Sequence, residues 1–84
     1  MARYQTSVIL GNFPEWYYLL VYYLSLGMSI ERCAEVLRVD RRSVYRALSS
    51  MREFLGIEDN RKLVEWFEQN GLTAEASRAR GVTL

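Results

Sequence analysis

The chain has 84 residues, of which half are hydrophobic, and a formal net charge of +1. This length suits one small domain, and the hydrophobic half is sufficient for a helical core. With no histidine and one cysteine, the sequence excludes a zinc finger and an intrachain disulfide. We expect Cys33 to be a buried core residue, as small apolar thiols usually are, and the protein to be cytoplasmic.

Several classes of function lack support in the sequence. The first residues do not show the ordered basic, apolar and small-residue regions of a signal peptide. The apolar run from Trp16 to Leu26 is about half as long as a membrane span. The chain has no metal-ligand spacing, no glycine-rich phosphate loop and no paired nucleophile and base. We therefore expect no enzyme activity, no cofactor, no metal, no small-molecule ligand and no membrane.

Residues 1–12 are predicted to form an N-terminal arm, because they carry only a weak alternating pattern. Asn12 and Glu15 then resemble a capping box, and Pro14 suits a first helical turn. The first helix is expected from about Phe13 to Leu26, ending at Gly27.

This first helix has almost no polar face and contains four tyrosines. One interpretation is a core helix whose tyrosine hydroxyls reach the surface while their rings are buried. The other is a helix with a second face for another protein chain, in which Tyr18 and Tyr22 form a possible second protein interface. The sequence does not choose between them.

Ser29 is predicted to cap a second helix at about 30–37, followed by a turn at Arg38 and Val39. Asp40 is a plausible N-cap for a third helix, 40–55, which ends at Gly56. Helical spacing places apolar residues on one side of this third helix: Val44, Ala47, Leu48, Met51, Phe54 and Leu55. The opposite side carries Arg42, Tyr45, Arg46, Ser49 and Arg52. A helix with arginines and an aromatic hydroxyl opposite a buried face suits the DNA major groove.

The charge is unevenly distributed along the chain. Residues 38–52 contain five arginines and one acid, a net charge of +4. Residues 53–71 contain five acids against one arginine and one lysine, a net charge of −3. The positive charge therefore gathers around the third helix, and this predicts salt-sensitive binding of nucleic acid.

A fourth helix is expected at about 61–70, opened by Asp59 or Asn60 and closed by Gly71. Its apolar residues span an arc of about 160°, which is more than one core can easily absorb. These residues are Leu63, Val64, Trp66 and Phe67. The expected fold class is all-α: a four-helix domain, 13–72, containing a helix-turn-helix, with a C-terminal tail at 73–84.

The segment SLGMSIERCAEVLRVDRRSVYRAL, followed by MREFLGIEDNRKLVEWFEQNGL, resembles the LuxR-type (NarL/GerE-type) helix-turn-helix DNA-binding domain. The matching positions are Gly27, Ser29, Ala34, Leu37, Val44, Leu48, Leu55, Gly56, Ile57, Val64 and Gly71. The chain departs from the family at Tyr45, where a lysine is usual, and at Ala47, where a histidine is common.

The resemblance implies a sequence-specific regulator of transcription, bacterial or from a phage, that binds double-stranded DNA as a homodimer. It implies DNA base contacts at Tyr45, Arg46 and Ser49, and DNA phosphate contacts at Arg41, Arg42 and Arg52. Because the fourth helix commonly forms the dimer contact in this family, it implies a dimer interface at Val64, Trp66 and Phe67. No sensor domain fits before the first helix, so we expect a stand-alone domain.

Two alternatives stay open. In the first alternative, the chain is a protein-interaction module that pairs with a larger transcription regulator or RNA polymerase through its tyrosine-rich helix 13–26. The low net charge and the tyrosines favour this reading. The other alternative is the DNA-binding part of a recombinase, or a domain resembling the promoter-reading part of a sigma factor.

Overall fold

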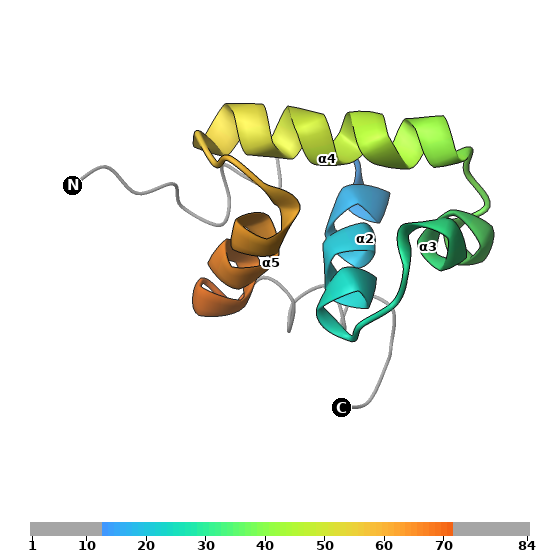
Figure 1. Ribbon diagram of the computed structural model, residues 1–84, viewed down its shortest axis with the longest axis horizontal. Helices are drawn as coiled ribbons and strands as arrows, with labels where there is room; N and C mark the ends of the chain where they lie inside the picture. Colours follow the sequence, from blue (N-terminus) through green and yellow to red (C-terminus); the bar gives the residue numbers. More distant parts are fainter. Residues whose placement is uncertain (1–12, 72–84) are drawn as a thin grey trace.

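The structure, a computed structural model, describes residues 13–71 and places four α-helices in them. The helices are α2 (Glu15–Ser25), α3 (Ile30–Leu37), α4 (Arg41–Leu55) and α5 (Asn60–Gln69), and α4 lies across the other three (Figure 1). Each predicted helix is found within two residues of its expected ends, which confirms the all-α four-helix class. The predicted arm 1–12 and tail 73–84 lie outside the described residues. None of these four helices combines the length and the apolar character that crossing a bilayer requires.

Helix α2 is the centre of the core. It contacts α3, α4 and α5, and its six successive residues 18–23 are all buried. Because other helices surround α2, an apolar sequence on every side of it is what the fold requires. The first interpretation of this helix, a core helix, is therefore correct.

The burial of Tyr18 and Tyr22 excludes these two residues as the possible second protein interface. Tyr18 and Tyr22 are only 4% and 3% exposed. The Tyr18 ring lies 6.0 Å from the ring of Phe67 on α5, and the Tyr22 ring lies 5.6 Å from that of Tyr23. Sequence spacing alone could not separate a helix buried on all sides from one with a free apolar face.

Two helices begin with the predicted side-chain caps. Ser29 Oγ accepts a hydrogen bond from the Arg32 N–H at 3.1 Å, at the start of α3. Asp59 Oδ1 accepts one from the Lys62 N–H at 2.8 Å, at the start of α5. Caps of this kind typically contribute about 1 kcal/mol each by satisfying a helix N–H.

The starts of the other two helices differ in detail from prediction, while α4 ends at the predicted glycine. Asp40 is the N-cap residue of α4, but its carboxylate accepts no capping hydrogen bond. Pro14 lies just before α2 rather than in its first turn, and its carbonyl accepts the Tyr17 N–H at 3.0 Å. Gly56 closes α4 with φ +69°, as a left-handed C-cap favours glycine.

Three residues, 38–40, connect α3 to α4 in a tight turn. Arg38 has φ +59° and is the one non-glycine residue with positive φ in 13–71. The Val39 N–H donates to the Ala34 carbonyl at 3.0 Å, and the Arg38 N–H donates to Glu35 at 3.3 Å. These bonds satisfy carbonyls in the last turn of α3 and close that helix.

Replacing Arg38 by glycine should stabilise the domain. A left-handed conformation strains any residue with a Cβ atom, so Arg38→Gly should raise the free energy of unfolding by about 1 kcal/mol. Gly56→Ala is the matched opposite change: a Cβ there meets nothing within 4 Å, yet φ is +69°. It should lower the free energy by about the same amount. Urea denaturation measures both, and equal stability of the Arg38→Gly variant and the unsubstituted protein would contradict the expectation.

Alkaline pH should destabilise the fold through Tyr18. Burial raises the pKa of Tyr18 from 10.0 to about 12, and a hydrogen bond with the Phe13 backbone partly offsets this. Above pH 10 the unfolded chain releases the phenol proton while the folded chain keeps it, so unfolding is favoured as pH rises. The contribution is fully present below pH 10 and is lost towards pH 12. Urea denaturation from pH 8 to 11.5 should show this loss, and Tyr18→Phe should show a smaller one.

Candidate nucleic-acid interface

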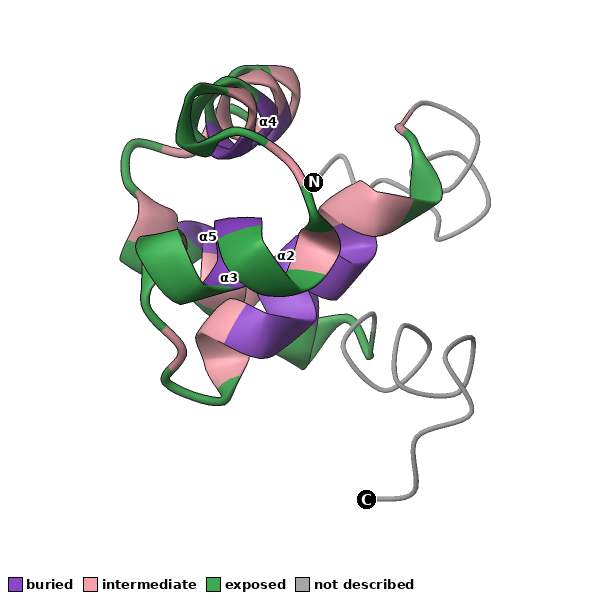
Figure 2. Ribbon diagram, turned by 90° about the vertical axis from the view of Figure 1, so that its right-hand side faces the viewer, coloured by how far each residue is buried: buried purple, intermediate pink, exposed green. Residues whose placement is uncertain are grey.

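Helix α4 has one face in the core and one face free of the other described helices. Its core residues are Val44, Ala47, Leu48 and Met51, each at most 1% exposed. Figure 2 looks nearly along α4 and shows α2, α3 and α5 on one side of it only. The fold therefore holds α4 by one side and leaves the other side exposed.

The exposed face of α4 carries the polar residues that the sequence singled out. Arg42, Tyr45, Arg46 and Ser49 are all exposed and fall within an arc of about 100° at 100° per residue. From Arg42 to Ser49 this reading face, as we call these four residues, is about 10 Å long. The structure thus brings together the three predicted base-contacting residues and one predicted phosphate-contacting residue. Tyr45, at 49% exposed, is one of the large hydrophobic residues that are open to solvent in the part of the chain that the structure describes.

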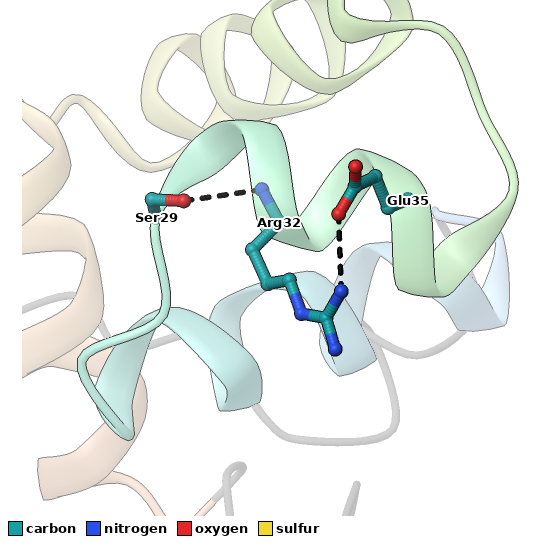
Figure 3. A network of polar contacts seen from close by, with 3 residues as sticks. All are labelled: Ser29, Arg32 and Glu35. Carbon is teal, nitrogen blue, oxygen red and sulfur yellow. Dashed lines mark hydrogen bonds and ion pairs between the residues drawn. The ribbon is translucent and has the colours of Figure 1, made fainter.

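Among the described residues, the ion pairs of α3 and α4 do not involve the arginines of the reading face. On α3, Arg32 Nη1 lies 3.1 Å from Glu35 Oε1 (Figure 3). Arg41 Nη1 lies 3.5 Å from Glu31 Oε2, so a phosphate at Arg41 would compete with this carboxylate. Within residues 13–71, Arg42 and Arg46 take part in no ion pair. An anionic ligand would therefore be drawn to the first half of α4 rather than to α3.

Arg52, another predicted phosphate contact, lies differently. Its side chain is only partly exposed, and its Nη1 donates to the Glu58 carbonyl at 3.3 Å. Its Nε is buried and has no hydrogen-bond partner among the described residues. The Arg52 guanidinium is thus directed to the connection between α4 and α5, which opposes the phosphate contact that the LuxR-type resemblance implies.

Glu53, counted in the sequence only among the acids of residues 53–71, also lies on this face. This residue is exposed and follows Ser49 by four positions, which places it on the same side of α4. The reading face is therefore basic over its first turns and ends in a carboxylate. The spacing of Arg46, Ser49 and Glu53 contains this signal. A nucleic acid would approach the N-terminal part of α4, because Glu53 repels phosphates at the other end.

On α5, the structure divides the apolar residues into two pairs. Leu63 and Phe67 are fully buried, and the Phe67 ring packs against those of Tyr18 and Trp66. Phe67 is therefore a core residue, and its predicted place in a dimer interface is wrong. Val64 and Trp66 are partly exposed, so they keep some surface for another chain.

Comparison of the chain with protein-family models, curated proteins and solved structures gives no match. The LuxR-type resemblance therefore stays a prediction from the sequence motifs.

Proposed function

We propose that this protein is a sequence-specific regulator of transcription that binds double-stranded DNA as a dimer, with α4 reading the major groove. The observation that carries the proposal is the two-sided character of α4. Its buried side is locked into the core, while Arg42, Tyr45, Arg46 and Ser49 share the exposed side. The tight connection to α3 matches the helix-turn-helix arrangement, in which the second helix enters the groove.

The dimensions and chemistry of the reading face fit base edges. The major groove is about 12 Å wide and admits one α-helix. Arg46 is suited to a bidentate contact with guanine O6 and N7, and within residues 13–71 it has no acidic partner to release first. Tyr45 and Ser49 lie one residue before and three residues after Arg46, and each supplies a hydroxyl that donates and accepts hydrogen bonds.

Phosphate contacts are supported at the beginning of α4. A surface hollow there is lined by Asp40, Arg41, Arg42 and Tyr45. Because the Asp40 carboxylate accepts no capping hydrogen bond, the first N–H groups of α4 have no side-chain acceptor from their N-cap residue. The positive end of the helix dipole and the Arg42 guanidinium favour a backbone phosphate, and together they must outweigh the Asp40 carboxylate that lines the same hollow. Such a contact orients the helix without reading sequence.

A dimer follows from the small size of a single reading face. One helix-turn-helix unit buries little surface on DNA, and two-fold dimers place two recognition helices about one turn apart. The partly exposed Val64 and Trp66 on α5 are the residues we propose for the contact between two copies. The LuxR-type resemblance also implies a dimer contact on this helix.

The test is selection of random duplex DNA by the purified protein at about 150 mM salt, near physiological ionic strength. Arg46→Ala is selected in parallel. The proposal expects the unsubstituted protein to enrich a two-fold-symmetric motif and Arg46→Ala to lose preference at one position in each half. Binding without enrichment of any motif, or the same motif from both proteins, would contradict it.

A further inference from the structure

The connection between α4 and α5 is held by a series of polar contacts that begins at Arg52. The Ile57 N–H donates to the Arg52 carbonyl at 2.8 Å, and Arg52 Nη1 donates to the Glu58 carbonyl at 3.3 Å. The Glu58 carboxylate lies 3.5 Å from Lys62 Nζ, and the Lys62 N–H is capped by Asp59. Arg52 therefore ties the last turns of α4 to the residues that lead into the first turn of α5.

The surroundings of Arg52 oppose a role in binding phosphate. Its Nε is buried, and moving the guanidinium outward to a DNA backbone would break the bond to Glu58. Arg42 offers the contrast, since it is exposed on the same helix and has no ion pair within residues 13–71. Helical spacing places both arginines on the polar side of α4, yet Arg42 is exposed to solvent and Arg52 is bonded to the next connection.

The angle between α4 and α5 affects DNA binding because one helix carries the reading face and the other carries the proposed dimer contact. The reading face is on α4, and the proposed dimer contact at Val64 and Trp66 is on α5. In a two-fold dimer this angle sets how far apart the two reading faces lie, and that distance must match about one turn of DNA. We propose that Arg52 is a positioning residue that fixes α5 relative to α4 and so sets the spacing between half-sites. This inference rests on the proposed DNA-binding function.

The test compares Arg52→Met with Arg42→Met. Methionine keeps an aliphatic stem but removes the charge and the donors, so both variants lose the same chemistry from one helix. The first readout is the salt dependence of binding to a duplex with one half-site. The second is binding to duplexes with two half-sites whose spacer is lengthened or shortened by single base pairs.

Arg52→Met should leave the salt slope unchanged and flatten the preference among spacers. Arg42→Met should lower the salt slope by about 0.9, the loss expected for one phosphate contact, and keep the spacer preference. A fall of about 0.9 in the slope for Arg52→Met, or an unchanged spacer preference, would overturn the inference. If Arg52→Met does not fold, Arg52→Gln replaces it under the same criteria.

A measurement without DNA separates this inference from the proposed function. Amide hydrogen exchange at Ile57, whose N–H is bonded to the Arg52 carbonyl, should accelerate in Arg52→Met and stay unchanged in Arg42→Met. Unchanged exchange in Arg52→Met would overturn the positioning role. If the unsubstituted protein binds no DNA, the proposed function fails, and exchange alone decides whether Arg52 holds the connection.

Discussion

Arg46→Ala should weaken binding to the selected DNA by roughly 5- to 150-fold, which corresponds to about 1–3 kcal/mol for a lost bidentate base contact. It should also relax the preference at one base pair in each half-site, because an arginine that reads guanine discriminates as well as binds. The folded state should be unaffected, since Arg46 is exposed and forms no ion pair within residues 13–71. Fluorescence anisotropy with the selected duplex and its single-base variants measures both effects.

Arg32→Ala is the matched control for this experiment. Arg32 is also an exposed helical arginine, but it lies on α3 and is paired with Glu35 (Figure 3). Its removal should change affinity far less than the removal of Arg46 and should leave the preference at every base pair intact. Equal losses in the two variants would mean that Arg46 contributes only general positive charge.

Phe67→Ala should remove most of the stability of the domain. Phe67 is fully buried against α2, and truncating a buried phenylalanine to alanine typically costs about 3–5 kcal/mol. A small domain has a total stability at the low end of about 5–15 kcal/mol, so this loss should take most of it. Urea denaturation monitored by circular dichroism, at a protein concentration too low for self-association, measures the loss.

Trp66→Ala separates core packing from dimer contact. Trp66 is adjacent to Phe67 and equally aromatic, but it is only partly buried. Its truncation should cost the monomer less than that of Phe67 and should weaken self-association in analytical ultracentrifugation. A Phe67→Ala variant that keeps its stability and loses only self-association would restore Phe67 to the dimer surface.

The helices could be predicted from the sequence because their ends depend on local chemistry. Ser29 and Asp59 each bond to an N–H three residues later, and Gly56 supplies the left-handed residue that ends α4. Such contacts involve only neighbours in the chain, so spacing reveals them. The buried and exposed faces of α4 could also be predicted from the sequence, because its polar and apolar residues repeat with a helical period.

The remaining errors concern how helices pack on one another. The apolar surface of α2 fits a central helix or a binding helix, and only its position among α3, α4 and α5 decides between them. Because the apolar arc of α5 is broad, helical spacing did not predict which of Val64, Trp66 and Phe67 faces the core. Arg52 lies on the polar side of α4 by spacing, yet a backbone carbonyl in the next connection accepts its hydrogen bond.

Two-dimensional NMR tests DNA binding by α4 directly, as a map of the backbone amide shifts when the selected duplex is added to isotope-labelled protein. If α4 reads the major groove, the largest shifts should fall on the exposed side of its first turns, at Arg42, Tyr45, Arg46 and Ser49. The amide shifts of residues on α5 should change less. Shifts that gather on α5 or on the α2–α3 connection, with α4 unchanged, would contradict the central claim.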